Sequence, residues 1–169
     1  MEVTGNTITS HIFKGLVLAG ILIVYAVVGE LTHTSHTEWF GWVKVVLLAI
    51  GIITGVLTHA AQLQGNVNFS QLLVHGLKTT AVVTCLYFIF ALLQLYVFFP
   101  GSLDEMVKLG LADAAKNGKI DQQKVAENMG QARKVVAIML LAGVVMGTMI
   151  LGLLAALLGA VLAKKNPVA

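Results

Sequence analysis

The sequence has little charge. Only 11% of its 169 residues are charged and 57% are hydrophobic, with a mean hydropathy of +0.88, whereas soluble domains carry about 25% charged residues. The apolar residues come in runs of about 20 or more, the length that crosses about 30 Å of hydrocarbon. A soluble domain is therefore excluded, and the sequence predicts an all-α integral membrane protein.

Residues that catalysis or covalent cross-linking would require are also scarce. Cys85 is the only cysteine, so no disulfide can form within the chain. The sequence contains no nucleophile beside a base, no glycine-rich phosphate loop and no pair of carboxylates inside a span. A proton-coupled transporter would need ionisable groups near the middle of the membrane, and no acid lies there. We therefore expect a protein that is not an enzyme and that needs no cofactor.

The net charge of +3 and the isoelectric point near 9.1 invite a comparison with nucleic-acid-binding proteins. However, the basic residues flank apolar segments instead of forming a patch with interleaved aromatic residues. Basic residues at the ends of spans are typical of contact with a membrane surface. We expect membrane lipid as a partner, together with a membrane protein or a second copy of the chain, and no nucleic acid.

Four apolar segments predict four transmembrane helices in a single domain over residues 1–169. Ser70 is a candidate N-cap for the third of them, and Pro100 with Gly101 stops it. The first segment is predicted to be an uncleaved anchor, because valine occupies a place where a signal-peptide cleavage site needs a small residue. The predicted spans are 12–31, 39–62, 70–99 and 135–163.

More than half of the charged residues lie in the polar segment between the third and fourth spans. We predict that residues 102–134 form an amphipathic helical hairpin, with Ser102 and Glu105 as a capping box and a reversal at Asn117 and Gly118. Its apolar stripes are either the lightly buried face of a solvated connector or a surface that docks a partner. The residues predicted to dock a partner are Met106, Val107, Val125 and Met129.

The distribution of basic residues bears on the orientation of the chain. The side of the termini has Lys14, Lys78, Lys164 and Lys165, whereas the side of the hairpin has Lys44, Lys108, Lys116, Lys119, Lys124, Arg133 and Lys134. A raw count places the hairpin in the cytoplasm. The hairpin's bases are balanced by acids, however, and Lys14 precedes the first span, which usually dominates. We therefore expect cytoplasmic termini.

Small residues recur on one face of several spans. In lipid the hydrophobic effect does not drive helices together, so close backbone approach at small residues must contribute. The stripes can serve packing within the chain or a homo-oligomer. The predicted helix-packing residues are Gly51, Gly55, Gly76, Gly143 and Gly147.

Two polar groups are candidate binding sites. Glu30, His33, His36 and Glu38 lie within nine residues, at a spacing that can hold a metal on a helix, although an interfacial loop is polar in any case.

The second group is a basic collar at the side of the termini. His59 and His75 each lie eight residues from Val67, so in a helical hairpin they sit at matched depth and can touch. A basic collar at this interface attracts phosphate head groups, and the alternative is ordinary snorkelling of basic side chains at helix ends. The collar comprises His11, Lys14, His59, His75, Lys78, Lys164 and Lys165.

The order of these features resembles the bacterial inner-membrane family catalogued as domain of unknown function 4199. The segments "GNVNFSQLLVHGLKTT" and "LYVFFPGSLDEM" carry the resemblance, at Phe69, Gly76, Lys78, Tyr96, Pro100 and Met106. It implies four helices in a bacterial inner membrane and no agreed activity.

Three functions are compatible with these observations. The first is a non-enzymatic inner-membrane accessory or scaffold subunit that docks a membrane partner. The second is a protein that binds a lipid or polyprenyl-phosphate head group at the basic collar. The third is a metal-dependent membrane enzyme centred on residues 30–38.

Overall fold

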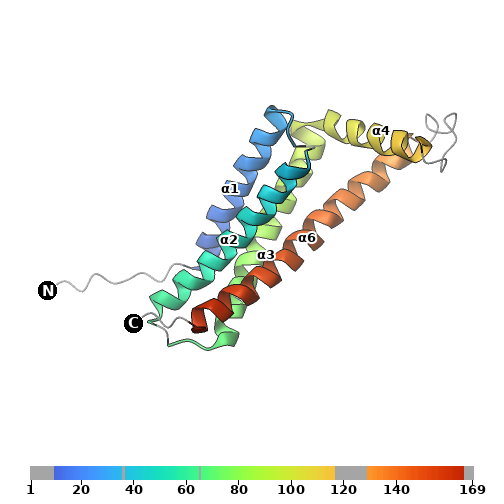
Figure 1. The fold of residues 1–169 in the computed structure, drawn as a ribbon. Helices are drawn as coiled ribbons and strands as arrows, with labels where there is room; N and C mark the ends of the chain where they lie inside the picture. The colour runs from blue at the N-terminus through green and yellow to red at the C-terminus, as the bar shows by residue number, and fades with distance from the viewer. Residues whose placement is uncertain (1–9, 36, 65, 117–128, 166–169) are drawn as a thin grey trace. The chain divides into compact units, whose positions relative to one another are not determined.

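The computed structural model describes residues 10–35, 37–64, 66–116 and 129–165, and every element in these ranges is a helix (Figure 1). Four helical segments are long and apolar enough to cross a membrane. This confirms the predicted all-α membrane fold with four transmembrane helices. The helices are α1 (His11–Leu31), α2 (Glu38–Gln62), α3 (Phe69–Leu93), the π-helix η1 (Gln94–Phe98), α4 (Pro100–Lys116) and α6 (Met129–Lys165).

The chain divides into two compact units, and the division falls within α3 and α6. One unit comprises residues 1–87 with 146–169, and the other comprises residues 88–145. The proposal of a single domain over residues 1–169 stays a prediction.

In the first unit, α1, α2, the beginning of α3 and the end of α6 pack around small and aliphatic side chains. Val56, Ala60, Leu72 and Ala160 form one buried cluster, with Phe69 packed against it. Large apolar side chains on the outward faces remain exposed, as the lipid-facing surface of a membrane protein requires. Examples are Ile12, Val24, Ile50 and Val161, which are 54%, 63%, 55% and 53% exposed.

Local side chains fix where the helices of this unit begin. The Ser10 Oγ accepts a hydrogen bond from the Phe13 N–H at 3.3 Å, which caps α1. The expected cap at Ser70 is wrong, because α3 already begins at Phe69. The Asn68 N–H instead donates to the Gln71 Oε1 at 3.0 Å, which is the backward half of a capping box.

In the second unit, α3 gives way to the π-helix η1 before the chain turns at Phe99. The Phe99 N–H donates to the carbonyl of Gln94, five residues earlier, at 2.9 Å. Phe99 itself has φ −135° and ψ 61°, which is consistent with the bias of a residue before proline away from helical geometry. The third helix therefore ends one residue earlier than predicted, and its last turn is widened.

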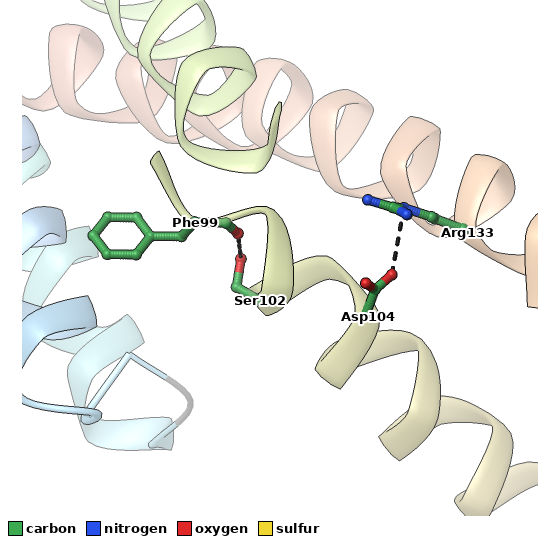
Figure 2. Close-up of polar contacts among 4 residues, drawn as sticks. All are labelled: Phe99, Ser102, Asp104 and Arg133. Atoms are coloured by element: carbon green, nitrogen blue, oxygen red, sulfur yellow. Dashed lines mark hydrogen bonds and ion pairs between the residues drawn. The ribbon is translucent and has the colours of Figure 1, made fainter. Parts of the chain in front are cut away.

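The start of α4 corrects the predicted capping box at Ser102 and Glu105. The helix begins at Pro100, because proline suits the first helical position, where its missing N–H costs nothing. Ser102 thus lies inside the helix, and its hydroxyl donates to the Phe99 carbonyl at 2.8 Å (Figure 2).

Helix α4 packs on α6 through a small apolar cluster. Leu95, Leu103, Val107 and Ala137 are buried together there. Figure 2 shows Asp104 reaching Arg133 on α6, with 3.4 Å between the Asp104 Oδ1 and the Arg133 Nε. Both side chains are more than 40% exposed, so this ion pair contributes at most about 1 kcal/mol, and the apolar cluster is the main contact.

Helix α6 runs without a break from Met129 to Lys165. Residues 129–134 are therefore continuous with the fourth span. The predicted reversal at Asn117 and Gly118, and the helix from Asp121, lie outside the described residues, so the hairpin stays a prediction.

Candidate functional site

Five basic side chains from three helices gather in the first unit, and we call them the basic cluster. His11 and Lys14 come from the first turn of α1, His59 from the end of α2, and His75 and Lys78 from the first half of α3. The His59 and His75 rings stack, with centroids 3.7 Å apart and planes inclined by 7°. His11 meets His75 edge-on at a centroid distance of 6.1 Å.

The stacking of His59 on His75 confirms that the two rings touch at matched depth. The end of α2, which carries His59, and the beginning of α3, which carries His75, are joined by a short turn in which Gln64 has φ 52°. This turn reverses the chain tightly enough to bring equally spaced residues face to face.

Close approach between backbones holds the cluster in place. A Cβ added to Gly76, the neighbour of His75, would lie 2.6 Å from the Cβ of Ala156 on α6 and 3.0 Å from a methyl of Val56 on α2. A Cβ on Gly15, the neighbour of Lys14, would lie 2.8 Å from the Cβ of Val82 on α3. Only glycine permits these separations, so the sequence at both positions sets the spacing of the helices that carry the basic residues.

The ammonium group of Lys14 points inward. Its Nζ donates to the Gly55 carbonyl of α2 at 2.9 Å, across 41 residues of sequence. The Thr58 hydroxyl donates to the same carbonyl at 3.0 Å. Since an ammonium group has three N–H donors, this contact positions Lys14 and uses one of the three.

Two ring nitrogens of the basic cluster are buried without a hydrogen-bond partner among the described residues, namely the Nδ1 of His59 and the Nε2 of His75. His75 is only 7% exposed. A buried polar atom without a partner costs about 1–3 kcal/mol, and native proteins leave few of them. A ligand that supplies hydrogen-bond partners would recover that free energy.

No carboxylate on these helices balances the basic cluster. The sequence has no acid between Glu38 and Asp104, none after Glu127, and none between Glu2 and Glu30. Glu30 follows Lys14 by 16 residues, which is about 24 Å along a helix. The neighbours of the two stacked histidines are other basic side chains instead: His11 and Lys14 lie near both rings, and Lys78 lies near His75.

The cluster lies inside the candidate spans and not in a loop. All five residues fall within His11–Leu31, Glu38–Gln62 or Phe69–Phe98. Ionisable residues within spans are costly and usually serve a function. Chemically, neighbouring lysines and histidines, whose nitrogens can bond to phosphate oxygens, are suited to an anion.

Two further members of the predicted collar, Lys164 and Lys165, end α6. The positions of their side chains lie outside the described part of the structure, so their membership stays a prediction.

The predicted metal site is not supported by the geometry. Over the described residues, no group of three or more His, Cys, Asp or Glu side chains is arranged to hold a metal ion. Glu30 ends α1, His33 adopts φ 55° in the connector and Glu38 begins α2. His36 lies outside the described residues.

The predicted docking stripe is also only partly described. Val107 is 1% exposed and packs against Leu95, Leu103 and Ala137, so its prediction as a docking residue is wrong. The narrow apolar stripe of α4 is satisfied by α6 instead. Met106 is half-buried, the side chain of Met129 is not described, and Val125 lies outside the described residues.

The predicted packing glycines divide into two groups. Gly51 meets the Leu18 side chain, Gly55 lies against Lys14, and Gly76 contacts two helices. For Gly143 and Gly147, no described atom outside the local helix lies within 4 Å of an added Cβ. Packing at these two positions stays a prediction.

Sequence reasoning missed a second polar arrangement in this unit, around Lys44. The Lys44 Nζ lies over the ring of Tyr87, 5.5 Å from its centroid, which is cation–π geometry. Nearby, the Tyr25 hydroxyl donates to the Phe40 carbonyl at 3.0 Å, and their rings stack at 4.1 Å. A lysine six residues inside a span was the available signal, but helical periodicity does not say which neighbouring helix it faces.

These observations define a four-span membrane protein with a preformed basic cluster inside its helices. The chain belongs to the family described as Protein of unknown function (DUF4199), whose family model matches residues 12–165. It matches no curated protein and no solved structure.

Proposed function

We propose that this chain is a non-enzymatic protein of the bacterial inner membrane that binds the phosphate head group of an anionic lipid, phospholipid or polyprenyl phosphate, at the basic cluster. One observation carries the proposal. The stacked His59 and His75 have unpartnered buried nitrogens beside Lys14, and no acid of these helices lies at that end.

The proposed orientation of the chain in the membrane also favours an anionic lipid as the ligand. We propose cytoplasmic termini, which put the basic cluster in the leaflet whose anionic lipids give the surface a negative potential. In a variant that lacks Cys85, a cysteine at position 117 is then labelled from outside and a cysteine at position 166 is not. The reverse pattern would overturn the orientation.

Replacing both lysines of the basic cluster with methionine tests lipid binding. The double variant Lys14→Met with Lys78→Met should bind phosphatidylglycerol about 30-fold more weakly, because a basic residue near anionic lipid contributes about 1 kcal/mol. Native mass spectrometry of protein in phosphatidylcholine nanodiscs with a fixed fraction of phosphatidylglycerol gives the affinity.

The matched control is Lys44→Met, which removes a lysine of α2 that lies in the same unit but outside the basic cluster. It should leave the affinity within about twofold. Equal affinities for the double variant and the wild type would refute lipid binding at this site.

An accessory or scaffold subunit that docks a membrane partner is the second candidate, and α6 is the observation that favours it. In its most hydrophobic window only 11% of residues are buried, against 28–33% in the other three spans. The positions Gly143 and Gly147 leave room for a closely packed helix.

Gly147→Leu tests this candidate, with Leu151→Ala as the matched control on the same helix. Since an added side chain at Gly147 meets no described neighbour, the variant should melt like the wild type and lose co-purifying protein. Unchanged co-purification would remove the candidate. The metal-dependent alternative has no supporting arrangement in the described residues.

A further inference from the structure

We infer that the head group held by the basic cluster is a phosphomonoester, with three terminal oxygens, and not a phosphodiester, which has two. This inference rests on the proposed function and deepens it, because it selects among anionic lipids by the chemistry of the phosphate.

The charge of the basic cluster matches a monoester better than a diester. Lys14 and Lys78 contribute two positive charges at this end of the unit, and the helices that carry them have no acid there. A phosphomonoester carries about −1.5 to −2 charges at pH 7, because its second proton leaves near pH 6. A phosphodiester carries a single negative charge and would leave one ammonium without a counter-charge.

Several hydrogen-bonding groups of the basic cluster are able to bind a phosphate. The His59 Nδ1 and the His75 Nε2 are buried and unpartnered, and the Lys14 ammonium keeps donors beyond the one bonded to the Gly55 carbonyl. A monoester provides one terminal oxygen for each of these three groups, whereas the two terminal oxygens of a diester must be shared among them.

A phosphomonoester can also share a proton with a buried imidazole. When the phosphate carries it, the P–OH group donates to an imidazole nitrogen. When the imidazole carries it, the N–H donates to the phosphate oxygen. Either way the proton lies between His75, which is more than nine-tenths buried, and the ligand. A diester has no such proton, so an imidazole nitrogen that acts as an acceptor remains unpartnered.

The surroundings favour a monoester attached to a lipid. Phe13 and Val74, the neighbours of Lys14 and His75, are 60% and 43% exposed and lie within candidate spans, where acyl chains can contact them. Free phosphate offers the same oxygens without the chain, so the experiment must separate the two sources.

The probes are dioleoyl phosphatidic acid and dioleoyl phosphatidylglycerol in phosphatidylcholine nanodiscs, with the diester also at twice the molar fraction to match charge. Inorganic phosphate and glycerol 3-phosphate are the soluble probes. The wild type should bind phosphatidic acid at least tenfold more tightly than phosphatidylglycerol, and this preference should persist at matched charge. The soluble probes should bind at least tenfold more weakly than phosphatidic acid.

His75→Phe removes the unpartnered nitrogen and keeps an aromatic ring against His59. This variant should lose the preference for phosphatidic acid, because its affinity for phosphatidic acid should fall by more than its affinity for phosphatidylglycerol. The matched control Tyr25→Phe removes a polar atom at the other end of the same unit and should retain the preference. Should His75→Phe fail to fold, His59→Phe replaces the other member of the stack with the same expectation.

Each remaining outcome has a distinct meaning. Equal binding of monoester and diester by the wild type overturns the monoester inference and leaves lipid binding in place. Binding of neither above phosphatidylcholine overturns both. Inorganic phosphate that binds as tightly as phosphatidic acid overturns the lipid source. A preference that survives in His75→Phe and His59→Phe overturns the role of the stacked pair.

Discussion

The two ends of the first unit differ in whether the polar groups inside the spans have interaction partners. Near the α1–α2 connector, the Tyr25 hydroxyl donates to a carbonyl and Lys44 lies over the Tyr87 ring. At the other end, His59 and His75 stack with unpartnered nitrogens among other basic side chains. Polar groups with partners stabilise the bundle, whereas buried polar groups without a partner cost stability unless a ligand completes them.

Among the variants that test this comparison, Gly76→Leu should change the free energy of unfolding most. The new side chain would meet Ala156 and Val56 and separate three helices, with an expected loss of about 3 kcal/mol in the free energy of unfolding. Thermal unfolding in detergent measures this. Gly20→Leu is the control, because an added Cβ there meets no described atom within 4 Å. Similar losses for both variants would contradict the close approach that positions His75.

Lys44→Met should lower the free energy of unfolding by about 1 kcal/mol, because it removes a half-buried cation from the Tyr87 ring. Lys78→Met is its counterpart at the other end. Lys78 is exposed, so its loss should change the free energy by less than about 0.5 kcal/mol. If Lys78→Met destabilises the protein more than Lys44→Met does, the proposed difference between the two ends is contradicted.

Tyr25→Phe should cost about 0.6 kcal/mol, the average for a hydrogen bond between helices in a membrane protein. The ring stack on Phe40 is retained, so the variant isolates the hydroxyl and its bond to the Phe40 carbonyl. Equilibrium unfolding in mixed micelles measures the difference. No measurable change would mean that this end gains nothing from its polar contact.

His75→Phe should change the free energy of unfolding least. Unlike the other variants, it should not lower this free energy. In lipid-free detergent it removes a buried nitrogen without a partner, so the free energy of unfolding should stay unchanged or rise by up to about 1 kcal/mol. The same unfolding assay applies. A loss of more than about 1 kcal/mol would show that His75 is already satisfied in the unliganded protein.

Much of the fold could be predicted from the sequence, because runs of apolar residues report spans directly. The stacking of His59 on His75 followed from their equal distance to Val67, which a tight helical reversal turns into matched depth. Local signals also worked where one residue dominates, as at Pro100, although the same proline moved the start of α4 ahead of Ser102.

Contacts between helices that are not joined by a short turn could not be predicted. The burial of Val107 against α6 and the position of Lys44 over Tyr87 depend on how helices rotate about their axes. The sequence of one helix shows which face of that helix is apolar, but it does not show which neighbouring helix covers that face. Likewise, the glycines at positions 76 and 147 look alike in sequence, and only the structure shows that the first contacts two helices.

The most direct test is the distance from the imidazole nitrogens of His75 to lipid phosphorus, measured by ¹⁵N–³¹P dipolar recoupling in solid-state NMR. The protein would carry ¹⁵N-labelled histidine in bilayers that contain phosphatidic acid, with His75→Phe to assign the signal. A hydrogen bond from nitrogen to a phosphate oxygen predicts a nitrogen–phosphorus distance of about 4 Å. A full-strength histidine signal with no recoupling to phosphorus would contradict the assignment of the basic cluster as a head-group site.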